Sequence, residues 1–192
     1  MRHAALRPLT MVAIALLVLC STPIGSHAWA DQRDGRLDPL FERLQETSDP
    51  VDAASIQQQI WQIWIESDDA ASNQLMRRGM AAMASGDPDS ALDAFDELVT
   101  LAPDFAEAWN KRATVYYLMG RLDESVTDIQ QTLELEPRHF GALSGLALIY
   151  DAVDKPEAAL RSLEAALEIN PHLHSSQERI RSLREKMKGT RT

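Results

Sequence analysis

The sequence predicts an all-α protein in which antiparallel helix pairs stack side by side into a solenoid. Pro103, Pro137 and Pro171 are spaced 34 residues apart. Between successive prolines, apolar residues recur at helical spacing, stop at a short polar or glycine break, and recur again. Small and large residues also occupy matching positions in three consecutive blocks. Because one helix pair cannot bury both of its faces, such blocks form a stable core only by stacking.

Residues 1–30 have the pattern of a secretory signal peptide. Arg2 and Arg7 precede an apolar run over 9–19, and Ala28-Trp29-Ala30 has the small-residue spacing of a cleavage site. The run is short for a membrane span. We therefore expect cleavage after Ala30 and a periplasmic location, with membrane contact only transient or through an uncleaved leader.

Cys20 raises the alternative that this leader is lipidated at the cysteine instead of being removed after Ala30. A lipoprotein signal places a small residue just before the cysteine, and Leu19 is large for that position. Lipidation would make the chain a membrane-tethered assembly or structural factor of the cell envelope, which is the alternative to a released protein. Cleavage after Ala30 removes the only cysteine, so the mature chain forms no internal disulfide.

Residues 31–71 predict an N-terminal helix pair, because 37–47 and 51–66 are both amphipathic. In the register of the later blocks this pair is a degenerate repeat that acts as a cap. Trp61 and Trp64 would then cover the exposed edge of the first full repeat. The alternative is that the two tryptophans form an exposed docking site.

Three repeats follow, at 72–105, 106–139 and 140–173. Within each block the 4th position is large, the 8th tiny, the 20th small and the 24th bulky. These positions hold Leu75, Trp109 and Leu143; Gly79, Ala113 and Ala147; Ala91, Ser125 and Ala159; and Phe95, Ile129 and Leu163. The small residues let two helix backbones approach, and the large ones fill the space beside them. Breaks fall at 85–87, 119–121 and 153–155, and Asp87-Pro88 reads as an N-cap followed by proline at the first helical position.

The repeat resembles the tetratricopeptide repeat (TPR) family, with its W-x-x-L-G-x-x-Y…A…F…P pattern. The middle block carries the resemblance through Trp109, Ala113, Tyr116, Ser125, Ile129 and Pro137. Arg78 and Arg112 stand where the family usually has leucine, Thr132 where it has alanine, and Ala82 where it has tyrosine. The resemblance implies a TPR-type α-solenoid whose usual role is to hold another protein.

Residues 174–192 predict a C-terminal capping helix and tail. Ile180, Leu183 and Met187 form a narrow apolar stripe, and the remaining positions are mostly charged. One apolar and one charged face is what the last helix of a solenoid needs to stay soluble.

Charge and motifs exclude several classes of function. Without the leader, 17 basic and 29 acidic residues leave a net charge of −12, which argues against nucleic acid as a partner. The chain has no nucleophile elbow, phosphate-binding glycine loop, H-E-x-x-H or C-x-x-C motif. His172 and His174 lie close together but have no acidic or cysteine ligand beside them. We therefore expect no catalytic residues, no metal and no cofactor.

The TPR resemblance implies a partner site on the concave groove, which the first helix of each pair lines. The residues carried over to this groove are Asn73, Met76, Arg77, Met80, Met83, Asn110, Lys111, Thr114, Tyr117, Ser144, Leu148 and Asp151. The methionines form a flexible apolar stripe, and Asn110 could pair with the backbone of an extended peptide. Alternatively, the methionines pack against the Trp61/Trp64 helix. Met76 and Met80 occupy positions where chaperone-binding TPR domains use lysine and asparagine, so a clamp for an EEVD-type tail is not supported.

Overall fold

The computed structural model describes residues 33–189 and confirms the all-α fold. These residues form nine helices and no strand. The predictions for the leader and for residues 190–192 lie outside the described part of the chain. The helices are α1 (Leu37–Glu46), α2 (Pro50–Ile65), α3 (Ala70–Ala84), α4 (Pro88–Leu101), α5 (Ala106–Leu118), α6 (Leu122–Leu135), α7 (Phe140–Ala152), α8 (Pro156–Ile169) and α9 (His174–Gly189).

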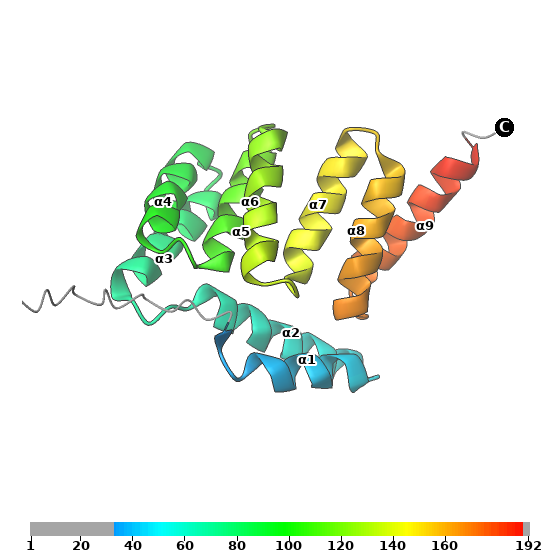
Figure 1. Cartoon of the computed structure of the whole chain (residues 1–192), viewed down its shortest axis with the longest axis horizontal. Helices are drawn as coiled ribbons and strands as arrows, with labels where there is room; N and C mark the ends of the chain where they lie inside the picture. The colour runs from blue at the N-terminus through cyan, green and yellow to red at the C-terminus, as the bar shows by residue number, and fades with distance from the viewer. Residues whose placement is uncertain (1–32, 190–192) are drawn as a thin grey trace, which may run out of the picture.

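Helices α3 to α9 stand in one row, each antiparallel to the next (Figure 1). The turn inside each pair needs one residue with a positive φ. Gly86 and Gly120 supply it at 73° and 74°, and Asp154 supplies it at 53°. Asp87 caps α4 by accepting a 3.1 Å hydrogen bond from the Ser90 amide, and Pro88 follows at the first helical position, as predicted.

The recurring small and large residues meet inside the pairs. A methyl group built on Gly79 would lie 2.5 Å from the ring of Phe95, which is fully buried. In the middle pair, the Ser125 hydroxyl donates a 2.7 Å hydrogen bond to the carbonyl of Ala113. The 8th and 20th positions therefore bring two backbones together, and the 24th fills the remaining space.

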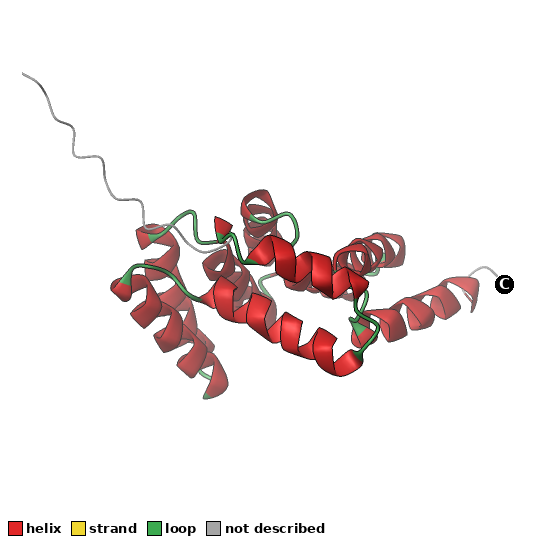
Figure 2. Cartoon of the chain, turned by 90° about the horizontal axis from the view of Figure 1, so that it is seen from below, coloured by secondary structure: helices red, strands yellow, loops and turns green. Residues whose placement is uncertain are grey.

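The α1–α2 pair does not stack at the end of this row. It lies across the base of the row, beneath the α6–α7 and α8–α9 turns (Figures 1 and 2). Trp64 is 1% exposed and packs on His139 and Phe140, with ring centroids 4.2 and 5.2 Å away. The expectation that the two tryptophans cover the first repeat is therefore wrong. The physical reason is that a bulky apolar face, Phe140 with Leu143, Ile169 and Leu173, is available at the base of the third repeat.

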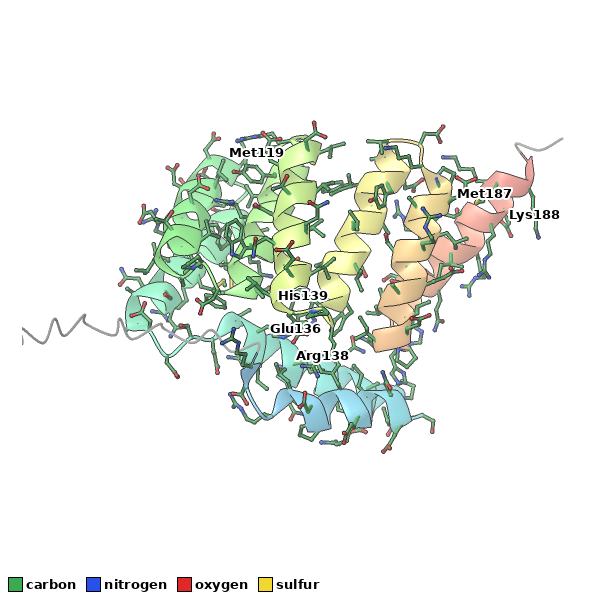
Figure 3. All side chains as sticks on the ribbon, viewed as in Figure 1. Met119, Glu136, Arg138, His139, Met187 and Lys188 are labelled. Carbon is green, nitrogen blue, oxygen red and sulfur yellow. The ribbon has the colours of Figure 1, made fainter. Side chains whose placement is uncertain are left out.

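Polar contacts fix the direction of the α1–α2 pair. The Arg138 guanidinium lies 2.7 Å from the Asp38 carboxylate and 3.2 Å from that of Glu136. The Gln45 amide donates to the carbonyl of Glu168, and the His172 ring lies 3.0 Å from the carbonyl of Leu44. Figure 3 shows Glu136, Arg138 and His139 in the α6–α7 turn, directly above the pair. These contacts attach the α1–α2 pair to the base of the solenoid and not to its N-terminal end.

Helix α9 closes the row at the C-terminal end. Ile180 and Leu183 are buried against α8, and Met187 is half-buried. Its cations reach back to the preceding pair, where Arg179 contacts Asp151 and Arg184 contacts Glu164, both at 2.8 Å. Within residues 33–189, none of the helices combines the length and the apolar character that a membrane span requires.

Candidate functional site

The part of the concave face nearest α2, which we call the base of the groove, is filled by the protein itself. The Trp61 ring lies so close to Gly141 that a methyl group there would be 2.6 Å from it. The Lys111 ammonium lies 5.4 Å from the centroid of the same ring. Gly141 lies in the first turn of α7 and Lys111 in the second turn of α5, so α2 covers the N-terminal parts of both groove helices.

A buried polar network lies under the tryptophans. The Glu107 carboxylate lies 2.8 Å from His139 Nε2, 2.8 Å from the Asn110 amide nitrogen that donates to it, and 2.9 Å from Lys111 Nζ. His139 Nδ1 accepts a 3.0 Å hydrogen bond from the Ala142 amide at the start of α7. Since Nδ1 is an acceptor, the proton of the neutral ring is on Nε2 and points at Glu107.

Glu107 is ionised in this network. Burial alone raises the pKa of a carboxyl group, but the Lys111 ammonium and the hydrogen bond from His139 outweigh it. The net effect is a pKa of Glu107 below its ordinary value. The network therefore has a structural role, because it connects α5, the α6–α7 turn and α2.

The side chains of several predicted groove residues are already buried or hydrogen-bonded within the protein. Asn110 is 7% exposed and bonded to Glu107, so it is not the free backbone-pairing amide that we expected. Met76 is 2% exposed in a core shared by α3, α4 and α5. The Asn73 side chain bonds to both backbone groups of Ser67, and the Ser144 hydroxyl donates to the carbonyl of Phe140.

The three methionines of the stripe neither line the groove together nor pack together against the Trp61/Trp64 helix. Met76 is buried and Met83 is partly buried in the core around Phe95 and Phe105, whereas Met80 is 37% exposed. The tryptophans belong to a different cluster, around Phe140. Only Met80 therefore offers a well-exposed thioether.

The upper part of the groove, away from α2, contains Thr114, Tyr117, Leu148 and Asp151. Thr114 is exposed, and Tyr117 and Leu148 are half-buried. They surround a slot of about 70 Å³ between α5, α6 and α7. Its full lining is Asn110, Ala113, Thr114, Tyr117, Ser125, Ile129, Gly141, Gly145 and Leu148. Asp151, at the far end, is paired with Arg179 and Lys186.

A second opening, which we call the α2–α3 cleft, has a volume of about 700 Å³. Four predicted residues line it, namely Asn73, Met76, Arg77 and Met80. Its opposite wall comes from the end of α2 and the loop that follows, including Glu66 and Asp68. The cleft exists because α2 packs beneath α5 and α7 and leaves the groove face of α3 uncovered.

The sequence did not indicate a role for Gly145. It also did not indicate that Glu107 pairs with His139. Gly141 and Gly145 are four residues apart and therefore share one face of α7, which is the signal that could have indicated an open slot. Glu107 and His139 are 32 residues apart and carried no comparable signal.

The two kinds of helix differ in charge. The second helices of the pairs, α4, α6 and α8, carry 11 acidic residues and one basic residue. The first helices, α3, α5 and α7, carry two acidic and four basic residues, and both acids are ion-paired. The negative charge of the solenoid is thus concentrated away from the groove. Within residues 33–189, no three potential metal ligands cluster together.

Comparison with known proteins gives consistent matches. Family models described as tetratricopeptide repeat match residues 76–128 and 104–171. A TPR repeat-containing protein of Rhizobium etli is 41% identical over 157 residues, covering 82% of this chain and 77% of that protein. A small glutamine-rich tetratricopeptide repeat-containing protein of Saccharomyces cerevisiae is 28% identical, covering 66% of this chain and 36% of its own length.

Solved structures share the fold at low identity. The first TPR of Spaghetti (RPAP3), bound to an HSP90 peptide, superposes with a TM-score of 0.60 at 20% identity, over 62% of this chain and 95% of that one. MamA superposes with a TM-score of 0.58 at 18% identity, over 77% of this chain and 84% of that one.

Proposed function

Because the chain belongs to the tetratricopeptide repeat family, we propose that it is a non-enzymatic scaffold that binds a peptide or protein segment in the upper part of its concave groove. The observation that carries this proposal is the slot at which Thr114, Tyr117 and Leu148 meet from two different first helices. Over α5 and α7 the base of the groove is closed by α2, so a partner that binds to these two helices has to bind above it.

The groove chemistry supports a polypeptide partner over a small charged substrate. Leu148, Thr114 and Tyr117 provide apolar area, a hydroxyl group and an aromatic ring with a polar tip. The RPAP3 domain, which has the same fold, was solved with a peptide bound. The EEVD-type clamp remains unsupported, since Met76 is buried and Met80 carries no charge.

The test is partner capture with a groove variant that keeps the core intact. Thr114→Ala combined with Tyr117→Ala changes two groove side chains, and neither belongs to the fully buried core. We expect the double variant to lose the proteins that the unaltered chain retains from an envelope extract, with a melting temperature nearly unchanged. Ser162→Ala, on the second helix of the third pair, is the control and should retain them. Retention by the double variant at the unaltered level would rule out the upper groove.

Export belongs to the same proposal. We propose that the leader is removed after Ala30 and that the mature protein is periplasmic, on the strength of the basic, apolar and Ala-Trp-Ala segments. Intact mass of the native protein, together with cell fractionation, tests this. We expect the soluble envelope fraction to contain a protein whose mass corresponds to a chain that begins at Asp31. A chain that keeps residues 1–30, or one lipidated at Cys20, would replace the released scaffold with a membrane-tethered one.

A further inference from the structure

We propose that the slot beside Gly145 binds one aliphatic side chain of an extended, uncharged segment of the partner. This inference rests on the proposed function and specifies the partner chemistry at the same groove. It follows from the size of the slot, from the hydrogen bonds of its polar lining residues, and from the charges around it.

The slot exists because α7 has glycine at two positions of the face that it presents to the slot, Gly141 and Gly145. At Gly141 the missing side chain is replaced by the Trp61 ring, which closes the lower end. At Gly145 nothing replaces it, since a methyl group there would meet only Ile129 Cδ1, at 3.7 Å. The open volume of about 70 Å³ therefore lies above Trp61 and beside Gly145.

Three of the polar residues that line the slot already have hydrogen-bond partners. The Ser125 hydroxyl donates to the carbonyl of Ala113 at 2.7 Å, and the Thr114 hydroxyl donates to that of Asn110 at 2.9 Å. The Asn110 amide donates to the buried Glu107 carboxylate at 2.8 Å. A polar group that entered the slot would lose its hydration and gain few hydrogen bonds in return. An aliphatic group has no such cost and covers Ala113, Ile129 and Leu148.

Charge around the slot argues against an ionised ligand. No ionisable side chain except the Tyr117 phenol lines it. Asp151, one turn beyond Leu148 on α7, is held by Arg179 and Lys186. A lysine or glutamate side chain inserted here would have no available counter-ion. The complementary segment is therefore uncharged where it crosses α5 and α7, and we expect leucine or valine at the inserted position.

The experiment uses the purified chain and blocked pentapeptides Ac-Gly-Ser-Xaa-Ser-Gly-NH₂, with leucine, glutamate or lysine at the centre. NMR titration follows the amide groups of Gly141 and Gly145 and the methyl group of Ile129. We expect the leucine peptide to shift these signals in a saturable way, and the glutamate and lysine peptides to leave them unchanged at equal concentration.

Gly145→Ala is the decisive variant, because its methyl group fits the helix and occupies the slot. We expect its melting temperature to be at least that of the unaltered chain, since alanine favours a helix over glycine. The Kd for the leucine peptide should rise about tenfold, the usual effect of one methyl group in an apolar pocket. Gly35→Ala is the matched control, because a methyl group there contacts nothing within 4 Å, and its Kd should be unchanged.

Two results would overturn the inference. One is equal binding of the charged and leucine peptides, or no shift of the Gly145 and Ile129 signals by any of them. The other is an unchanged Kd in Gly145→Ala. If either occurs while Thr114→Ala/Tyr117→Ala still abolishes partner capture, the upper groove remains the binding surface and the slot is not used. If the double variant also retains the partner, the proposed function fails as well.

Discussion

The indole of Trp64 stacks on the imidazole of His139, with ring centroids 4.2 Å apart and planes inclined by 11°. This contact joins the N-terminal helix pair to the α6–α7 turn, and through Glu107 to the groove helix α5. The pair is therefore a built-in part of the groove wall. It determines which part of the concave face is open to another molecule.

His139 should be the residue whose loss most weakens this docking. His139→Ala removes the cap of α7, worth about 1 kcal/mol, and opens a cavity beneath Trp64, for a total of about 3 kcal/mol in the free energy of unfolding. Urea unfolding followed by tryptophan fluorescence measures it. His139→Asn keeps a capping side chain but loses the stacking, so it should fall between the alanine variant and the unaltered chain. Equal stability of the alanine variant and the unaltered chain would show that the Trp64–His139 contact does not hold the pair.

Acid should weaken the same connection through Glu107. Its pKa is lowered in the folded protein, so the ionised carboxylate stabilises the fold above its unfolded pKa of about 4.5. That stabilisation is lost as the pH falls through the still lower folded pKa. The measurement is the free energy of unfolding at pH 6 and at about pH 3.5, compared between the unaltered chain and Glu107→Gln.

The Gln variant should be less stable at pH 6 and should lose less on acidification, because it has no proton to bind at this site. Other carboxyl groups, such as those of Asp69 and Asp87, contribute to the acid response of both chains equally. The difference between the two pH dependences is therefore the readout. Parallel curves would mean that the pKa of Glu107 is the same in the folded and the unfolded chain.

Two glycines in first helices should respond oppositely to alanine. The added methyl group at Gly79 would lie 2.5 Å from the buried ring of Phe95, so Gly79→Ala should lower the free energy of unfolding by about 1–3 kcal/mol. At Gly145 the methyl group has room, and the helix preference of alanine should raise the free energy of unfolding by up to about 1 kcal/mol. Urea unfolding of both variants tests the packing register. A gain at Gly79 would contradict the close approach of α3 and α4.

Arg112 should stabilise the fold although the family pattern favours leucine at this position. Its guanidinium lies 2.7 Å from Asp128, which is 2% exposed, and 2.8 Å from Asp96. The hydrogen bond with Asp128 raises the pKa of Arg112, so its guanidinium stays ionised. Arg112→Leu leaves Asp128 buried without its cation and should cost about 3–5 kcal/mol.

Removing the buried Asp128 carboxylate as well should recover part of the stability that Arg112→Leu loses. Arg112→Leu combined with Asp128→Leu removes both charges, and we expect it to be more stable than Arg112→Leu alone. The thermal midpoint of the four chains in this double-mutant cycle provides the check. Additive losses would show that the two side chains do not interact.

The repeat part of the fold could be predicted from the sequence because its contacts are local and periodic. Gly79 meets Phe95 within one pair, and Ser125 meets Ala113 within the next, so each contact recurs with the 34-residue period. The same period located the first helix of each pair, and the resemblance to TPR domains then implied Thr114, Tyr117 and Leu148 as groove residues. A helix pair that must bury its second face has few arrangements other than stacking.

Only the tertiary structure determined where the α1–α2 pair lies, and hence which half of the groove is open. Asp38 meets Arg138 across 100 residues, and Trp64 meets His139 far along the chain, so neither contact lies within one repeat. An amphipathic helix pair carries an apolar face in its sequence but not the identity of the surface that will cover it. That identity depends on the shape and apolar area that the folded solenoid presents at its base, around Phe140.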